Sequence, residues 1–258
     1  MKKLYIGTNT KMYKTISQTT EFLKRLEELT ADIPAEELFL FVIPSFTALE
    51  KAKSVLHRVQ LGAQNMCWED EGQFTGEISP LMLKEIGVSI TEIGHSERRH
   101  VFGERDEEEH KKVLASLRHG FIPLLCVGET LEQKNYGIAD EILKIQLKVA
   151  FNGIPAGEIK KCMVAYEPVW AIGTSGIPAT KEYAKEKHSV IRETLTGLCG
   201  ESTGGSIPIL YGGSVNNENA GEFIGMDNID GLFIGRSAWQ ADNFNTIIRM
   251  VLPIFKEK

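Results

Sequence analysis

Eight short apolar runs, each followed by a stretch with helical periodicity, limit what this chain can fold into more than any other feature. The runs are rich in β-branched or aromatic residues and are mostly continuous rather than alternating. That pattern is typical of strands in a parallel sheet covered by helices. The expected strands are Leu4–Gly7, Leu38–Ile43, Val59–Ala63, Ser89–Ile93, Ile122–Val127, Met163–Tyr166, Ile207–Tyr211 and Gly231–Ile234.

The stretches between these runs are predicted helices. From Ser17 to Leu29, apolar residues recur at three- and four-residue steps, and Ser17 is the expected N-cap. The helix expected to start at Asp106 has an acidic first turn, which suits the positive end of the helix dipole. The expected helices are Ser17–Leu29, Ala48–Leu56, Pro80–Ile86, Asp106–Leu117, Ala139–Ala150, Lys181–Leu198, Asn217–Ile224 and Phe244–Phe255.

The number of these units predicts the architecture. Eight βα units in 258 residues, with no Pro-, Gly- or Ser-rich linker, predict an α/β fold: a (β/α)8 barrel forming a single domain over residues 1–258. The alternative is an open doubly wound sheet. Such sheets often begin with a G-x-G-x-x-G turn, and Gly7-Thr8-Asn9 does not match it.

The composition excludes several classes of function. There are 29 basic and 35 acidic residues, so the net charge is −6 and no nucleic-acid partner is expected. No run of 18 apolar residues is present, so no membrane association is expected. The apolar stretch near the N-terminus is too short for a signal peptide. The four cysteines are far apart and predict free thiols in a reducing, cytoplasmic environment.

Polar residues follow the predicted strands where a barrel places its chemistry, at the carboxyl ends. Asn9 and Lys11 follow the first strand, His95 and Glu97 the fourth, and Glu167 the sixth. Each alone is weak evidence, because every strand must end in something polar. Together they predict one rim that carries a cation, an imidazole and a carboxylate.

Two of these residues are candidates for proton transfer. Glu167 stands beside Pro168 and Trp170, where desolvation would raise its pKa and make it a stronger base; the alternative is a structural ion pair. His95 could donate to a substrate oxygen or be an ordinary rim residue. The other histidines are expected at the surface: His57, His100, His110, His119 and His188. No cluster has metal-ligand spacing, so no metal is expected.

Small-residue loops after the late strands indicate an anion site. They are Gly173-Thr174-Ser175-Gly176, Gly212-Gly213-Ser214 and Gly235-Arg236-Ser237. Exposed backbone N–H groups at such loops bind phosphate in many barrels, although each loop alone could be an ordinary βα turn. Lys11 would add positive charge on the same side.

Four motifs together resemble the triosephosphate isomerase family. They are Asn9-Thr10-Lys11-Met12, Gly94-His95-Ser96-Glu97-Arg98-Arg99, Ala165 to Thr174 (AYEPVWAIGT) and Tyr211-Gly212-Gly213-Ser214-Val215. They occur in the family's order and with its spacing, from Gly7 to Trp239. The resemblance implies a TIM barrel and a cofactor-free isomerase that moves a proton between adjacent carbons of a sugar phosphate through an enediolate. If the substrate is a triose phosphate, the resemblance further implies a role in glycolysis and gluconeogenesis.

The resemblance also implies roles, position by position. Glu167 matches the catalytic base, His95 the electrophile, and Lys11 the lysine that balances developing charge, with Glu97 supporting it. Asn9, Gly173, Ser214 and Gly235 match substrate-binding positions, and Arg236 lies beside the last of these. Trp170–Ala179 matches a closing loop. The loop Gly72–Glu77, around Phe74-Thr75-Gly76, matches the segment that docks into a second subunit, so the resemblance implies a homodimer.

Three departures from the family pattern concern the substrate. Thr10 and Tyr13 stand beside the Asn–Lys pair, the loop 173–180 is one residue longer and contains Pro178, and Gly235-Arg236-Ser237-Ala238-Trp239 replaces the usual last phosphate loop. These features look like a branch of the family associated with erythrulose phosphates.

Several readings therefore stay open. The first is the pair dihydroxyacetone phosphate and glyceraldehyde 3-phosphate, and the second is the pair L-erythrulose 1-phosphate and D-erythrulose 4-phosphate. A catalytically silent phosphate-binding barrel and a lysine Schiff-base aldolase are the readings from other classes, and no lysine ends a middle strand to support the aldolase.

Overall fold

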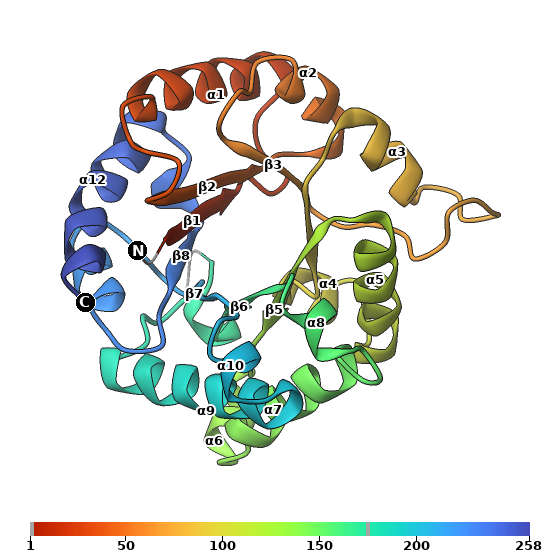
Figure 1. Cartoon of the computed structure of the whole chain (residues 1–258), viewed down its shortest axis with the longest axis vertical. Coiled ribbons are helices and arrows are strands. Elements are labelled where there is room, and N and C mark those ends of the chain that lie inside the picture. Colours follow the sequence, from red (N-terminus) through yellow and green to blue (C-terminus); the bar gives the residue numbers. More distant parts are fainter. Residues whose placement is uncertain (1–2, 174–175) are drawn as a thin grey trace.

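Parallel hydrogen bonding closes the sheet into a barrel. The computed structural model describes residues 3–173 and 176–258, and within them eight strands pair in chain order, β8 returning to β1 (Figure 1). In the closing pair, Tyr5 lies opposite Gly231 and Thr8 opposite Ile234. The strands are β1 Leu4–Asn9, β2 Leu38–Ile43, β3 Gln60–Ala63, β4 Ile90–Ile93, β5 Ile122–Val127, β6 Met163–Tyr166, β7 Ile209–Tyr211 and β8 Gly231–Ile234.

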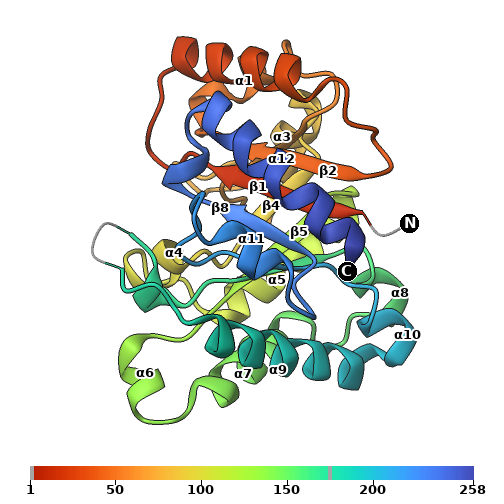
Figure 2. The same cartoon turned by 90° about the vertical axis from the view of Figure 1, so that its left-hand side faces the viewer.

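Helices surround the barrel on all sides, as the views down the barrel and from the side show (Figures 1 and 2). They are α1 Ile16–Thr30, α2 Leu49–Lys53, α3 Pro80–Ile86, α4 Ser96–His100, α5 Asp106–His119, α6 Leu131–Asn135, α7 Ala139–Ala150, α8 Ala156–Ile159, α9 Lys181–Cys199, α10 Glu201–Gly204, α11 Ala220–Ile224 and α12 Ala241–Glu257. Short 3-10 turns occur at η1 Phe46–Ala48, η2 Val169–Ala171 and η3 Arg236–Ala238. The single-domain (β/α)8 barrel expected from the sequence is confirmed.

The element boundaries correct several details. The N-cap of α1 is Thr15 rather than Ser17: the Thr15 hydroxyl accepts from the Gln18 N–H, and the Gln18 side chain accepts from the Thr15 N–H. This reciprocal capping box satisfies two donors at once, which the Ser17 hydroxyl inside the first turn does not do. The helix expected over Ala48–Leu56 is a 3-10 turn followed by α2, and the one expected from Asn217 starts at Ala220.

Two apolar layers fill the molecule. Inside the barrel, the rings of Phe41 and Phe233 stack with centroids 5.7 Å apart. Gly7 permits this packing, because a Cβ at that position would stand 2.3 Å from the Phe41 ring. A larger core lies between the strands and the helices, where residues such as Phe22, Leu23 and Leu26 of α1 are buried. The barrel interior is thus filled by side chains, and the open space lies at the strand ends.

The structure confirms the expected state of the cysteines but not the expected position of every histidine. All four cysteines are free thiols, as expected. His57 and His100 are exposed, whereas His188 is fully buried, so its expected surface position is wrong. His188 lies on the inner side of α9, between the rings of Tyr166 and Tyr211. Its Nδ1 is 2.8 Å from the carbonyl oxygen of Asn228, to which it donates.

Burial of His188 predicts an acid-sensitive contribution to stability. Burial lowers the pKa of His188 from 6.5 to about 3. The unfolded chain therefore binds a proton at a pH where the folded chain does not, and stability falls as the pH drops from 6.5 toward 3. We expect His188→Gln to reduce this loss, which amounts to about 2.7 kcal/mol by pH 4.5, about two units below the pKa of 6.5 in the unfolded chain.

Urea unfolding at pH 7 and pH 4.5 measures this effect. The exposed His57→Gln variant is the matched control, and it should lose as much stability on acidification as the unaltered protein. An equal loss in His188→Gln and the control would contradict the prediction.

Candidate active site

A pocket of about 430 Å³ opens at the carboxyl ends of the strands. All of the sequence-predicted site residues line it: Asn9, Lys11, His95, Glu97, Glu167, Gly173, Ser214, Gly235 and Arg236. These residues follow five different strands, and barrel closure brings them to one rim. The predicted loop residues Thr174 and Ser175 lie outside the described residues.

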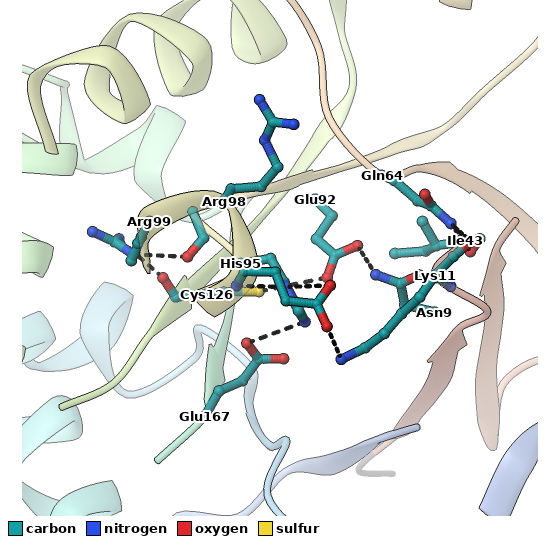
Figure 3. Close-up of polar contacts among 12 residues, drawn as sticks. Asn9, Lys11, Ile43, Gln64, Glu92, His95, Arg98, Arg99, Cys126 and Glu167 are labelled. Atoms are coloured by element: carbon teal, nitrogen blue, oxygen red, sulfur yellow. Dashed lines mark hydrogen bonds and ion pairs between the residues drawn. The ribbon is translucent and has the colours of Figure 1, made fainter. Parts of the chain in front are cut away.

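Glu167 and His95 face each other across this pocket. The His95 Nε2 and a Glu167 carboxylate oxygen are 3.8 Å apart, and both side chains are almost fully buried (Figure 3). The Glu167 N–H donates to the carbonyl of Val127, which fixes the backbone directly after β6. The Glu167 Oε2 atom has no hydrogen-bond partner among the described residues. Because Glu167 also lines the pocket, this oxygen is available to a ligand there.

The start of α4 sets the tautomer of His95. The Glu97 N–H donates to His95 Nδ1 at 3.1 Å, so Nδ1 is an acceptor and carries no proton in this arrangement. In the neutral imidazole the proton then resides on Nε2, which faces Glu167 and the pocket. His95 therefore presents an N–H donor toward the space in front of Glu167.

Lys11 reaches the same space from the end of β1. Its backbone has a φ of 51°, a left-handed conformation that non-glycine residues rarely adopt. Two side chains hold it: the Asn9 Oδ1 accepts from the Lys11 N–H at 2.6 Å, and Gln64 Nε2 donates to the Lys11 carbonyl at 2.8 Å (Figure 3). The Lys11 ammonium lies 2.8 Å from Glu97.

The ammonium group of Lys11 favours the ionised form of the Glu97 carboxyl group. Partial burial would raise the pKa of Glu97, but the hydrogen bond and charge of the Lys11 ammonium outweigh burial and lower it. Glu97 thus stays ionised, and Lys11 is held at the pocket with a compensating charge beside it. The expected support of Lys11 by Glu97 corresponds to this contact.

The opposite end of the pocket is formed by the loops after β6, β7 and β8. Gly173, with φ 87°, Ser214 and Gly235 line it, and a Cβ at Gly235 would meet nothing within 4 Å. Arg236 is exposed and pairs with no other described side chain. Several backbone amides and one cation around an open space suit an anionic group such as a phosphate.

Two aromatic side chains that the strand-end pattern did not single out, Tyr13 and Trp239, border this end of the pocket. The rings of Tyr13 and Trp239 pack with centroids 4.6 Å apart, and Trp239 Nε1 donates to the Asn9 carbonyl at 2.9 Å. This contact ties the loop after β8 to the end of β1. Tyr13 and Trp239 each belong to a departure from the family pattern. Those departures are the sequence signal that could have pointed to this pair.

A buried carboxyl group anchors the segment after β6. Glu129 follows β5 and is fully buried. It accepts from the hydroxyls of Tyr166 and Tyr183 and from Trp170 Nε1, at 2.8 to 3.2 Å. Burial and the nearby Glu129 raise the pKa of the Tyr166 hydroxyl well above its usual range, so this hydroxyl remains a donor. Trp170 begins the expected closing loop, so Glu129 fixes one of its ends.

Glu92 of β4 is a buried carboxyl group beside the pocket that the strand-end pattern did not single out. The ligand-type atoms of Glu92, His95 and Glu167 all lie within 4.8 Å of one another. The three residues are far apart in sequence, so spacing could not reveal the cluster. The expectation that no metal takes part stays a prediction.

These features define a class of protein: a (β/α)8 barrel whose rim pocket brings together a carboxylate, an imidazole, an ammonium group and glycine-rich loops. A sequence profile described as triosephosphate isomerase matches residues 4–251. The chain belongs to the triosephosphate isomerase family, and it is an isomerase.

Curated relatives extend this comparison over nearly the full length. The chain is 49% identical to an L-erythrulose-1-phosphate isomerase of Rhizobium etli, over 96% of this chain and 92% of that protein. It is 47% identical to the protein of the same name from Mesorhizobium japonicum, over 95% of each chain. It is 44% identical to the one from Brucella abortus, over 96% of each. Among the described residues, no helix is long and apolar enough to cross a membrane.

The contacts of Glu129 predict a large effect of its removal on stability. We expect Glu129→Ala to lower the free energy of unfolding by about 2–4 kcal/mol, because three donors lose their acceptor in a buried place. Urea denaturation followed by tryptophan fluorescence measures the change. Glu132→Ala, which removes an exposed carboxyl group three residues later, is the control and should cost less than about 1 kcal/mol. Equal stability of the two variants would refute this role.

Proposed function

We propose that this protein interconverts L-erythrulose 1-phosphate and D-erythrulose 4-phosphate. The observation that carries the substrate is the near full-length similarity to three relatives of that name, at 44–49% identity. The facing pair of Glu167 and His95 supports the reaction type. Of the two substrate pairs that the sequence leaves open, the relatives favour the four-carbon pair over dihydroxyacetone phosphate and glyceraldehyde 3-phosphate.

The proposed chemistry moves one proton and shifts a carbonyl group by one carbon. Glu167 removes the proton from C3, and the electron pair of the broken C–H bond forms the C2–C3 double bond. The His95 Nε2–H protonates the carbonyl oxygen on C2, which gives an enediol. The proton on Glu167 then returns to C2, the O3 hydroxyl gives its proton to His95 Nε2, which restores the neutral imidazole, and the carbonyl forms at C3. No electron enters or leaves, so no cofactor is required.

The other residues stabilise the charge that develops. Lys11 places an ammonium group at the pocket, where negative charge appears on the substrate oxygens. Asn9 holds the Lys11 backbone in its left-handed conformation. Gly173, Ser214 and Gly235 would bind the phosphate through backbone amides, with Arg236 contributing its N–H or its guanidinium group.

The proposal extends to assembly and location. The segment between β3 and α3 projects from the body of the molecule (Figure 1), and Phe74 within it is exposed. Met12, Val101 and Phe102 are exposed as well. An exposed aromatic side chain on a projecting segment, together with exposed apolar side chains on other loops, supports the homodimer through the loop around Phe74-Thr75-Gly76. A cytoplasmic location is part of the proposal and rests on the free cysteines.

Steady-state kinetics on both substrate pairs test the substrate. We expect kcat/KM for L-erythrulose 1-phosphate to exceed that for dihydroxyacetone phosphate by at least about a hundredfold, because binding of the extra hydroxymethyl group contributes about 3 kcal/mol or more. The assay contains only protein and substrate, with a chelator added in a parallel run to test for a metal. A higher value for the triose would assign the triose reaction instead. A rate abolished by the chelator would contradict the metal-free mechanism.

Loss of the base should abolish proton transfer while leaving binding. We expect Glu167→Gln to reduce kcat by at least about a thousandfold, because an amide cannot accept the C3 proton. Exchange of that hydrogen with solvent deuterium, followed by NMR, should vanish as well. Glu132→Gln, far from the pocket lining, serves as the control. Undiminished exchange in Glu167→Gln would refute the mechanism.

A further inference from the structure

Glu92 is a carboxyl group inside the barrel for which the proposed mechanism has no use. It belongs to β4, three residues before His95, and only 1% of it is exposed. Its neighbours on the strand, Thr91 and Ile93, belong to the layer between strand and helices; the Thr91 hydroxyl, for example, bonds Ser116 of α5. Alternation along a strand therefore directs Glu92 toward the barrel axis.

Its contacts place this carboxyl group directly below the reacting groups. The Asn9 Nδ2 donates to Glu92 Oε2 at 2.7 Å, and the other oxygen, Oε1, is 3.9 Å from the Cys126 sulfur (Figure 3). A Glu92 oxygen lies within 4.8 Å of ligand atoms of both His95 and Glu167. Among the described residues, no basic side chain forms an ion pair with it.

Burial and the neighbouring charges favour the protonated form of Glu92. Burial, followed by the charge of Glu167, raises the pKa of Glu92 well above its usual range, and the Asn9 hydrogen bond opposes this only in part. In this protonated form Glu92 offers both an O–H donor and a carbonyl acceptor. Asn9 donates to Oε2, and the weak thiol contact at Oε1 leaves hydrogen-bonding capacity unused beside His95 and Glu167.

The layout of the pocket determines which part of a substrate reaches Glu92. The anion-binding loops follow β6, β7 and β8, and β4 lies across the barrel from β8. With the phosphate at those loops and the two reacting carbons between Glu167 and His95, the chain continues toward β4. In a three-carbon phosphate the chain ends at the reacting pair. In a four-carbon phosphate one hydroxymethyl group remains beyond it.

We propose that Glu92, together with Asn9, binds the terminal hydroxyl of a four-carbon substrate and thereby selects it over the three-carbon analogue. This inference rests on the proposed function. A polar pair built to bond a hydroxyl group discriminates against a substrate that lacks it, because the buried polar groups are then left unpaired. Glu92 is in this view a specificity-determining residue, and the proton transfer itself belongs to Glu167 and His95.

The test compares kcat/KM for L-erythrulose 1-phosphate with that for dihydroxyacetone phosphate in a set of variants. We expect Glu92→Leu to lower the ratio of the two values at least about tenfold, which is one lost hydrogen bond of roughly 1.4 kcal/mol. Glu92→Gln, an isosteric neutral group with donor and acceptor, should keep the ratio within about threefold. Glu92→Asp withdraws the group by one methylene and should lower the ratio like Glu92→Leu.

Thr91→Val is the matched control. It removes a buried hydrogen bond from the adjacent position of the same strand, on the face turned away from the pocket. It should lower the melting temperature and leave the ratio unchanged. If Glu92→Leu does not fold, as judged by circular dichroism, the Glu92→Asp and Glu92→Gln pair makes the same comparison.

The outcomes separate this inference from the proposed function. A ratio that falls in Glu92→Leu or Glu92→Asp and holds in Glu92→Gln supports the inference. An equal loss on both substrates overturns it and makes Glu92 a structural residue only. A preference of the unaltered protein for the triose overturns the proposed function, and the inference with it, before any variant is compared.

Discussion

The pairing of β8 with β1 is the interaction on which the rest of the structure depends. Parallel hydrogen bonds between Tyr5–Thr8 and Gly231–Ile234 close the sheet, so every strand has two neighbours and all carboxyl ends meet on one rim. Residues that are 83 or 230 positions apart in the chain come within 3 Å of each other for this reason. The facing of Glu167 and His95, from β6 and β4, is a direct consequence.

Closure also makes the site costly to build, because it draws carboxyl groups out of water. Each of the buried acids near the site has a different environment. Glu129 accepts three donors, Glu92 accepts a hydrogen bond from Asn9, and Glu167 retains an oxygen with no hydrogen-bond donor in the described part of the chain. These differences separate groups that hold the structure from a group available for chemistry. The unsatisfied oxygen is therefore the one expected to act on substrate.

The rim is held by contacts that run across strands rather than along them. Trp239 bonds the Asn9 carbonyl, and the Asn9 side chain bonds both Glu92 and the Lys11 backbone. One asparagine thus connects β8, β4 and the left-handed residue that carries the ammonium group. Such a network preorganises the pocket, since the groups are in place before a ligand arrives. It also connects Glu92 to Lys11, so a substitution at Glu92 can change the position of the Lys11 backbone through Asn9.

The sequence by itself determined the eight βα units, the strand ends and the candidate residues at them, because periodicity and strand-end polarity are local properties. It also carried the family motifs around His95 and Glu167. It did not reveal that His188 is buried, that Thr15 caps α1, or that Glu92 stands beneath the reacting pair. Those facts depend on which face of an element meets which neighbour. Only the tertiary structure decided them, since barrel closure brings side chains from distant strands into one low-dielectric interior.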